Sequence, residues 1–594
     1  MTDTHSSAPG LATAMAAASP PPPLGTPFEH IALAFSGGGF MAASFCLGSL
    51  SYLDHVTFSD TSGNSSLLEK IRYISSASGG TITSASFALA CAEGNTFAQF
   101  FDSLISKLQQ QGLLKRALEI LNTTAAWQQR PSKHRNLINA FALSYDETLF
   151  HGATLADLQK KKPGGMNIPL EELCFNSTEF YLGLPFRQNT KLAPDSKPDP
   201  FFFFGNNYIH LDPAVAGKIR IADAMANSSC FPAGFEPMKF PDDLSYKGLD
   251  NATLSNALQC NKELLDTASI AALQTKGFGI MDGGITDNQG LEDLMLADAR
   301  RSRQDTSFSP FDLIMVTDVG SQYMAPYDVP PINQASLPGR LNYVSLRWVF
   351  FALLPILTLI LIWLGWKCHH HWSAGLCFGG AGLLLGLTIL FFGVNKFIPG
   401  PKSKTGPLHD FSPDIITLLL GFFGRSSIGL LAQMISARVS SMLILSSSVF
   451  MKRIRQLIYD SFFQSPQYSD RRMANHIYDL SFTNDLNRSR MTTPNSPALN
   501  KAIQTVAQQA FDMPIALWFG VAETAELPAL IACGQFTTCY NLLEYTRELT
   551  ENKTLFASLD PFYQKRITDI RASLLKDWEK FSADPLWLFN QPHG

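Results

Sequence analysis

Three consecutive glycines directly after a short apolar segment constrain the fold of this chain more than any other feature. The segment Ile31–Phe35 reads IALAF, and Gly37–Gly39 follow it after one serine. A glycine run at that position lets the backbone bend sharply or lets another group come very close. Apolar residues then recur with helical spacing between Ala43 and Leu53. The pattern predicts a buried strand, a tight glycine turn and a helix.

Similar apolar segments alternate with helical ones between Glu29 and about Gly320, which predicts a layered α/β fold. Each expected strand ends at small or polar residues, where α/β proteins place their functional sites. The expected strands are Ile31–Phe35, Arg72–Ser75, Phe278–Met281 and Leu313–Val316.

Charge and cysteine content narrow the class of function. The 594 residues include 46 basic and 50 acidic side chains, so no nucleic-acid partner is indicated. The nine cysteines are scattered without CxxC pairs or metal-ligand spacing, which indicates reduced thiols and no metal site. Residues 1–26 are rich in Ala, Ser and Pro and lack the positive start of a signal peptide. We expect them to form a disordered leader.

Two long uncharged segments, residues 348–366 and 373–394, predict membrane-spanning helices. Tryptophans stand near their ends, and glycines recur one turn apart in the second segment. We therefore expect a two-helix transmembrane hairpin within residues 331–411, and a buried hydrophobic hairpin is the alternative. Basic residues flank the pair on its outer sides, which predicts that the rest of the chain faces the cytoplasm.

Residues 412–594 are expected to be mainly helical. Between Ile415 and Met451 the chain is apolar but interrupted by arginines and serines, and it ends in the basic run Lys452–Arg455. Such a stretch either lies along a membrane surface or packs as amphipathic helices on the globular domain. The pattern leaves both interpretations open.

The glycine run also fits the dinucleotide-binding fingerprint G-x-G-x-x-A, since Ala42 follows at the right spacing. That site needs an acidic residue at the end of a second strand, about 20 positions later. Asp54 is the nearest candidate, but it lies within a helical pattern. The sequence therefore disfavours a dinucleotide site.

A serine between small residues gives the glycine run a better partner. Ser78 stands in SASGG, between an apolar strand and the helical run Thr81–Ala90, as in a nucleophile elbow. A serine nucleophile needs a base and hydrogen-bond donors for the developing oxyanion. The N–H groups of the glycine loop can supply the donors. Asp282, which follows the strand-like GFGIM, can supply the base at the same sheet edge.

Together these motifs closely resemble the patatin-like phospholipase family, with its glycine-rich oxyanion loop, G-x-S-x-G elbow and D-G-[GA] segment. The resemblance covers about residues 30–320 and implies a layered α/β/α domain with a Ser-Asp dyad. It implies that Ser78 is the nucleophile and Asp282 the base. The implied oxyanion loop comprises Gly37, Gly38 and Gly39, and the supporting positions are Ser76, Gly80, Gly283 and Gly284.

By the same resemblance, the protein is expected to hydrolyse acyl esters of membrane lipids, as a phospholipase or lysophospholipase, without a metal or an organic cofactor. Two positions depart from the family pattern. Ser76 replaces the first glycine of the elbow, and Met41 replaces a basic residue after the glycine loop. A weaker resemblance returns between Met513 and Gly534, which is consistent with a hairpin inserted into one domain.

The expected organisation is a leader (1–26), a catalytic domain (27–330), a transmembrane hairpin (331–411) and a helical region (412–594), part of which packs back on the catalytic domain. An inactive, membrane-anchored lipid-binding or scaffold protein is the non-enzymatic alternative. A Ser-His-Asp hydrolase is the enzymatic one, with His476 or His409 as the base. The adjacent histidines His369–His371 are expected to form a solvated loop instead of a metal site.

Overall fold

The computed structural model divides into two compact units. Unit 1 comprises Met1–Tyr323 and Ser446–Gly594, and unit 2 comprises Met324–Leu445. The structure describes residues 24–61, 63–109, 112–128, 130–192, 203–232, 234–303, 308–321, 324, 327, 352–367, 371–397, 426–484, 496–516 and 519–591.

Unit 1 is built on a mixed sheet with the order β10-β8-β7-β6-β5-β4-β1-β12-β13, and β11 pairs with β5 and β9. The strands from β5 through β4, β1 and β12 to β13 are parallel, and the remaining pairs are antiparallel. The strands are β1 (Ile31–Phe35), β4 (Ile71–Ser76), β5 (Glu172–Glu179), β6 (Pro185–Lys191), β7 (Phe204–Gly205), β8 (Ile209–Leu211), β9 (Met238–Phe240), β10 (Leu258–Cys260), β11 (Phe278–Asp282), β12 (Leu313–Asp318) and β13 (Arg472–His476). A separate hairpin is formed by β2 (Thr57–Asp60) and β3 (Gly63–Ser66).

The four strands expected from the sequence are confirmed as β1, β4, β11 and β12. Every residue of β1 and β12 is buried, because parallel strands in the middle of a sheet are covered on both faces. β13 was not predicted. It is a short edge strand of alternating burial that the C-terminal part of the chain adds next to β12.

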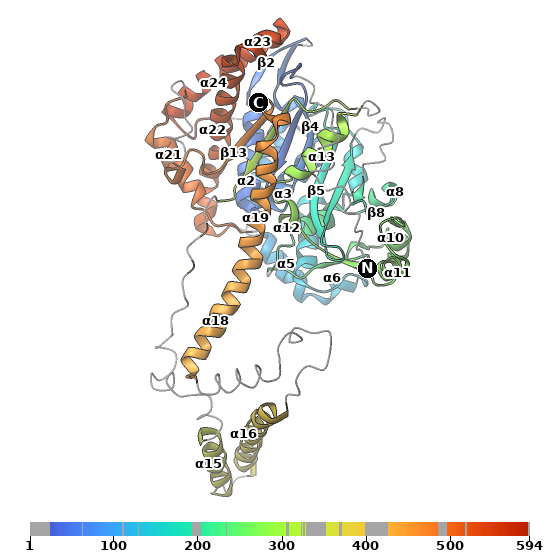
Figure 1. Cartoon of the computed structure of the whole chain (residues 1–594), viewed down its shortest axis with the longest axis vertical. Helices are drawn as coiled ribbons and strands as arrows, with labels where there is room; N and C mark the ends of the chain where they lie inside the picture. Colours follow the sequence, from blue (N-terminus) through green and yellow to red (C-terminus); the bar gives the residue numbers. More distant parts are fainter. Residues whose placement is uncertain are drawn as a thin grey trace, which may run out of the picture. The chain divides into compact units, whose positions relative to one another are not determined.

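Helices cover the sheet, with α21, α22 and α24 gathered on one side and α8, α10 and α11 on the other (Figure 1). The helices of unit 1 are α2 (Gly39–His55), α3 (Gly79–Glu93), α4 (Phe97–Gln109), α5 (Gly112–Asn122), α6 (Thr124–Gln128), α7 (Leu137–Tyr145), α8 (Pro213–Ala216), α9 (Ile221–Ser229), α10 (Asn251–Ala257), α11 (Thr267–Lys276), α12 (Gly284–Asp287), α13 (Leu291–Arg301), α19 (Phe450–Gln464), α21 (Lys501–Phe511), α22 (Val521–Glu551), α23 (Lys553–Ser558) and α24 (Pro561–Ala583).

The C-terminal helix α22 packs directly on the N-terminal helix α2 through a pair of glycines. A Cβ atom added to Gly48 would overlap the carbonyl oxygen of Ile531, and one added to Gly534 would overlap that of Phe45. The two helix backbones can approach this closely only because both positions lack a side chain. The first and last thirds of the chain therefore share one hydrophobic core.

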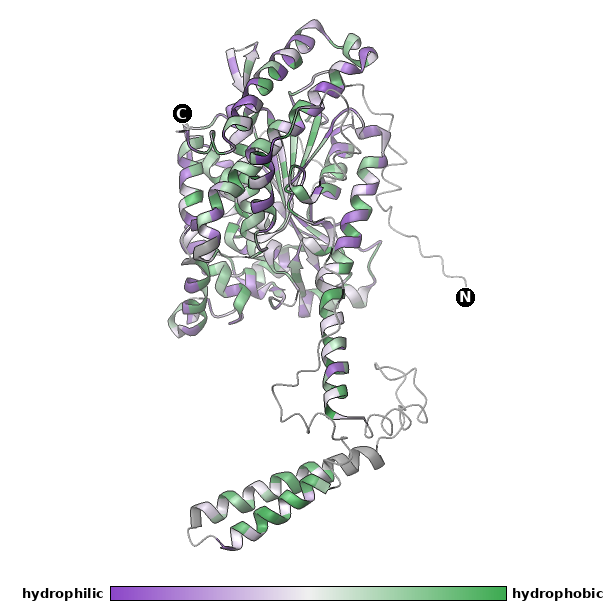
Figure 2. Ribbon diagram, turned by 90° about the vertical axis from the view of Figure 1, so that its left-hand side faces the viewer, coloured by the Kyte–Doolittle hydropathy of each residue, from purple (hydrophilic) through white to green (hydrophobic). Residues whose placement is uncertain are grey.

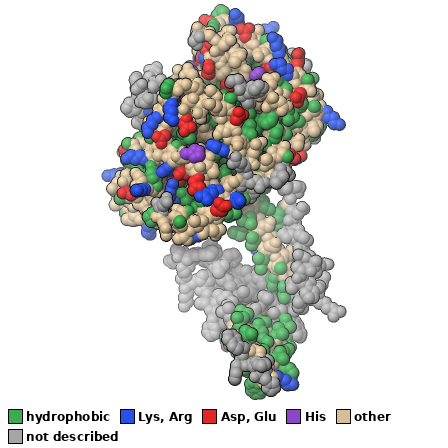
Figure 3. Space-filling model, turned by 180° about the vertical axis from the view of Figure 1, so that it is seen from behind, with side chains coloured by type: hydrophobic (Ala, Val, Ile, Leu, Met, Phe, Trp, Pro, Cys, Tyr) green, Lys and Arg blue, Asp and Glu red, His purple; other side chains and the backbone are tan. Residues whose placement is uncertain are grey.

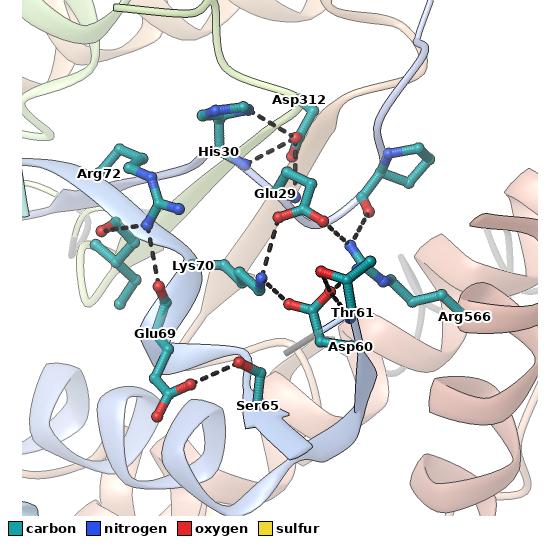
Figure 4. Close-up of polar contacts among 12 residues, drawn as sticks. Glu29, His30, Asp60, Thr61, Ser65, Glu69, Lys70, Arg72, Asp312 and Arg566 are labelled. Atoms are coloured by element: carbon teal, nitrogen blue, oxygen red, sulfur yellow. Dashed lines mark hydrogen bonds and ion pairs between the residues drawn. The ribbon is translucent and has the colours of Figure 1, made fainter. Parts of the chain in front are cut away.

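A network of charged side chains lies where β1, β4 and β12 begin. Glu29 precedes β1 and Lys70 precedes β4, and their side chains form an ion pair of 3.0 Å. Arg566 of α24 binds Glu29 and also Asp60, at 2.8 Å from the latter (Figure 4). Asp312, just before β12, accepts hydrogen bonds from the backbone N–H groups of Glu29 and His30. This network ties α24 to the amino ends of the central strands.

Unit 2 contains α15 (Leu354–Lys367), α16 (His371–Phe397) and α18 (Ile428–Ile444). Hydrophobic residues predominate along α15 and α16, and many of these side chains are exposed (Figure 2). On the face of unit 1 in Figure 3, basic and acidic side chains are interspersed with hydrophobic ones, and hydrophobic side chains predominate on the described part of unit 2.

The prediction of two membrane-spanning helices is not supported. Among the described residues, no helix combines the length and the hydropathy needed to cross a membrane. The helix expected over residues 348–366 is α15, which has 14 residues. The topology inferred from the flanking charges depended on the two spans and is not supported either.

Candidate active site

Ser78 stands at a strained turn between β4 and α3. Its backbone angles are φ 48° and ψ −116°, in a region that non-glycine residues rarely adopt. A Cβ atom added to Gly79 would overlap the carbonyl oxygen of Gly39, and one added to Gly80 would lie 2.6 Å from that of Phe35. The predicted elbow is therefore held against β1 and the glycine loop, and only glycine fits at these two positions.

Ser228 of α9 fixes the backbone of the elbow. The N–H of Ser78 donates to both the carbonyl oxygen and the hydroxyl oxygen of Ser228, each at 3.0 Å. The same hydroxyl lies 3.0 Å from the hydroxyl of Thr81 in α3. No role for Ser228 was predicted from the sequence.

The other serine of the elbow, Ser76, has a structural position. It is fully buried, and its hydroxyl lies 2.7 Å from that of Ser84 and 3.1 Å from that of Thr81. It also donates to the carbonyl oxygen of Cys174 at 3.3 Å. This side chain occupies the space that a glycine would leave free, and its polar group is satisfied inside the core.

The glycine loop offers two N–H donors, not three. The N–H of Gly37 already donates to the carbonyl oxygen of Asn288 at 2.8 Å. Gly38 and Gly39 have φ angles of +149° and +58°, and no hydrogen bond is recorded for their N–H groups within the described part of the chain. The sequence predicted oxyanion donors at Gly37, Gly38 and Gly39. Because the Gly37 N–H is already bonded, the N–H groups of Gly38 and Gly39 are the candidate donors.

The far end of the chain supports the loop. The N–H of Phe40 donates to the carbonyl oxygen of Ala516 at 2.7 Å, and a Cβ atom on Gly39 would overlap that oxygen. Ala516 lies in the segment from Met513 to Gly534, which the sequence had marked as a weaker resemblance.

Asp282 ends β11 and lies in the interior, with 2% of its surface exposed. Burial raises the pKa of its carboxyl group to about 7, although hydrogen bonds from the Gly284 N–H and the Ser78 hydroxyl favour the ionised form. The Gly284 N–H lies 2.5 Å from Oδ1. No cation contributes to this shift among the described groups. Ser78 and Asp282, about two hundred residues apart in sequence, thus lie close enough for the hydroxyl to affect the pKa of the carboxyl group.

The two glycines after Asp282 are required by close packing. A Cβ atom on Gly283 would overlap the carbonyl oxygen of Asn176. One on Gly284 would lie 2.8 Å from Oδ1 of Asp282 and 2.9 Å from Oδ1 of Asn288.

Asn288 is a part of the site that sequence reasoning missed. Its carbonyl holds the Gly37 N–H, and its side-chain oxygen would lie 2.5 Å from a Cβ atom on Gly37. It therefore stands between the glycine loop and the segment of Asp282. Its place within GIMDGGITDNQG was the available signal, but spacing alone does not say which of those polar residues turns toward the loop.

The histidine-dependent alternative is not supported by the placement of His476. This residue ends β13, bonds to Asp479 at 3.2 Å and stacks on Tyr478. Burial lowers the pKa of His476, but the charges of Asp479 and Asp318 and the hydrogen bond to Asp479 together raise it above its usual value. His409 lies outside the described residues, as do His369 and His370 of the histidine tract.

A cavity of about 790 Å³ lies between α5 and the segment that precedes α22, and its lining includes the polar side chains of Lys115, Glu119, Asn122 and Thr123. Leu114, Leu118 and Phe519 supply apolar side chains to its lining. Phe519 packs edge-on against Phe40 of α2, with ring centroids 5.4 Å apart. The cavity therefore adjoins the helix that begins at the glycine loop.

Comparisons with known proteins agree with the motifs in the N-terminal half of the chain. Residues 33–295 match the sequence model of the patatin-like phospholipase family. This range contains the glycine loop, Ser78 and Asp282. No match to a protein of curated function was found. Among solved structures, human GIVD cytosolic phospholipase A2 is similar, with 15% sequence identity and a TM-score of 0.29. The similarity covers 49% of this chain and 45% of that chain, so less than half of the known protein is spanned.

Proposed function

We propose that the protein is a serine acyl hydrolase that cleaves lipid esters through Ser78 and Asp282. One observation carries the proposal. A serine in a strained turn lies near a buried carboxyl group whose pKa is raised to about 7, beside two glycine N–H groups without recorded partners among the described residues. A nucleophile, a base and oxyanion donors are the parts that ester hydrolysis requires.

In the proposed first step, Asp282 accepts the hydroxyl proton as the Ser78 oxygen attacks the ester carbonyl. The N–H groups of Gly38 and Gly39 stabilise the negative charge on the tetrahedral intermediate. Its collapse forms the acyl-enzyme and releases the alcohol, which takes the proton from Asp282. Water, deprotonated by Asp282, then attacks the acyl-enzyme and releases the fatty acid and Ser78.

The raised pKa of Asp282 suits this role. An ordinary aspartate, with a pKa of about 3.9, is a weak base toward an alcohol. A general base works best when its pKa is near the working pH, and burial brings the pKa of Asp282 to about 7.

Two regions suit a lipid substrate. The cavity beside Phe519 has room for part of an acyl chain. The exposed hydrophobic side chains of α15 and α16, with Trp366 83% exposed, suit contact with a lipid surface without crossing it. We therefore propose a peripheral association of unit 2 with membranes, which vesicle flotation of the full-length protein tests.

The catalytic proposal is tested with a fluorophosphonate probe, which reacts only with an activated serine. The wild-type protein and the Ser76→Ala variant should be labelled, and Ser78→Ala should not. Peptide mapping should locate the adduct on Ser78. An unlabelled, correctly folded wild-type protein would favour the inactive lipid-binding alternative.

A further inference from the structure

The first turn of α19 lies against the candidate site. A Cβ atom added to Gly284 would lie 3.0 Å from Cε of Met451, and 2.8 Å from Oδ1 of Asp282. Ile458 and Phe462, two and three turns further along α19, are buried in a core that includes residues of α13. The helix is therefore anchored, and its first turn is held beside Asp282.

Arg455 connects the same turn to the other side of the site. Its guanidinium donates to Oδ2 of Asp318 and to the carbonyl oxygen of Gly320, both at 2.9 Å. The residue between these two, Val319, packs on the glycine loop, since a Cβ atom on Gly38 would overlap its Cγ2. The beginning of α19 thus reaches from the Asp282 segment to the segment behind the glycine loop.

Lys452 is the residue after Met451 and lies three residues, about one helical turn, before Arg455. Residues three apart share a helix face, so Lys452 lies next to Arg455, one residue from the Met451 contact. Its side chain is half-buried, and no hydrogen bond or ion pair is recorded for its ammonium group within the described ranges. Arg455 is neutralised by Asp318, whereas Lys452 has no recorded carboxylate partner.

The electrostatics of Lys452 agree with this placement. Partial burial, together with the nearby charge of Arg455, lowers the pKa of Lys452. A cation in such surroundings gains from the approach of an anion, because the anion offsets both the lost hydration and the repulsion. The first turn of α2 supplies no charge here, since the position after the loop is the buried Met41.

We infer that Lys452 binds the phosphate group of the lipid whose ester Ser78 attacks, and that the enzyme prefers glycerophospholipids to neutral glycerides. The inference rests on the proposed hydrolase function. In a glycerophospholipid the phosphate is only a few bonds from the acyl ester, so a cation in the first turn of α19 can hold it while the carbonyl occupies the glycine loop. Lysine serves as a point charge for phosphate.

The experiment compares full-length wild type with Lys452→Gln, Lys452→Arg and the control Arg453→Gln. Arg453 is the exposed neighbour on the same turn and bonds only Gln456 within the described residues, at 3.2 Å. Phosphatidylcholine and diacylglycerol with identical acyl chains are presented in the same mixed micelles. The measured quantity is the ratio of the two kcat/KM values.

Lys452→Gln should lower this ratio about tenfold, as expected from losing one charge-assisted hydrogen bond. Lys452→Arg should retain most of the ratio, and Arg453→Gln should match the wild type. An unchanged ratio in Lys452→Gln, or an equal change in Arg453→Gln, would overturn the inference.

A binding experiment separates this inference from the proposed function. Dihexanoyl phosphatidic acid, dihexanoylglycerol and inorganic phosphate are titrated into Ser78→Ala protein with and without Lys452→Gln. Tighter binding of the phosphatidic acid that requires Lys452 supports the inference even if the wild type hydrolyses nothing. Equal binding with and without Lys452 contradicts it. Equal Lys452-dependent binding of inorganic phosphate would mean a free-anion site instead of a lipid site, and would also overturn it.

Discussion

Two groups of carboxylates in unit 1 have opposite electrostatic surroundings. At the amino ends of β1, β4 and β12, the carboxylates of Glu29 and Asp60 are held by Lys70 and Arg566 (Figure 4). At the end of β11, Asp282 is buried without a recorded cation, unlike Asp318 at the end of β12, which is paired with Arg455. Paired charges contribute to holding the chain together, whereas the carboxylate without a cation has a raised pKa and can exchange a proton.

The difference teaches how one residue type serves two purposes in one unit. A guanidinium beside a carboxylate favours its ionised form and makes it a poor base. Removing the cation and keeping the burial has the reverse effect, at a cost in stability. Each of the four predictions below tests either the charge network around Arg566 or the candidate active site around Asp282.

The largest effect is expected from Asp282→Asn. Because this variant lacks the base, its rate of ester hydrolysis should be lower by about a thousandfold or more. Ser78→Ala should lower the rate equally, since the two groups act as a unit. Stability should respond in the opposite direction. Burial raises the folded-state pKa of Asp282 to about 7, so ionising it in the folded protein costs stability as pH rises through 7.

Asp282→Asn should therefore match or exceed the wild type in unfolding temperature at pH 8, with a smaller difference at pH 5. Activity assays and thermal unfolding at both pH values check this. A variant that lost activity through unfolding would contradict it.

Arg566→Ala should be the most destabilising change at the amino ends. The side chain is 1% exposed and serves both Glu29 and Asp60. Breaking a buried ion pair typically costs about 3–5 kcal/mol, since the partner charge stays behind. Urea unfolding should show a loss of this order, with hydrolysis by the folded fraction unchanged. Lys565→Ala, an exposed neighbour on α24, is the control and should stay within about 0.5 kcal/mol.

The pH dependence of hydrolysis should show an acid limb governed by Asp282. Below about pH 7 its carboxyl group becomes protonated, so kcat/KM should fall about tenfold for each further pH unit. Burial also raises the pKa of Asp287 to about 7, so Asp287→Asn is the matched control. In the wild type, the Asp287 carboxylate caps α13 by accepting hydrogen bonds from the N–H groups of Leu291 and Asp293. If Asp287→Asn abolished the acid limb, the titrating base would be misassigned.

The smallest effect is expected from Ser76→Ala. The hydroxyl is buried among Ser84, Thr81 and the carbonyl of Cys174, so its loss should cost about 1 kcal/mol in unfolding free energy. Hydrolysis should remain near that of the wild type, because Ser78 and Asp282 are untouched. An inactive but stable Ser76→Ala protein would move the nucleophile to Ser76.

Sequence alone was sufficient for the parts of this protein that depend on local patterning. The strand β1, the glycine turn and the start of α3 follow from apolar runs that end at glycine and serine, because backbone freedom is encoded residue by residue. The same reasoning predicted two membrane spans in unit 2, which no helix among the described residues supports. It also missed β13, whose five residues become a strand only by pairing with β12.

Only the tertiary structure decided which groups of the site are engaged. The sequence marked Gly37, Gly38 and Gly39 alike, but the carbonyl of Asn288, about 250 positions away, occupies the first N–H. It could not reveal that Ala516 supports the loop, that Ser228 fixes the elbow, or that α19 brings Met451 beside Gly284. Hydrogen bonding and burial depend on neighbours in space, and here those neighbours come from segments hundreds of residues apart.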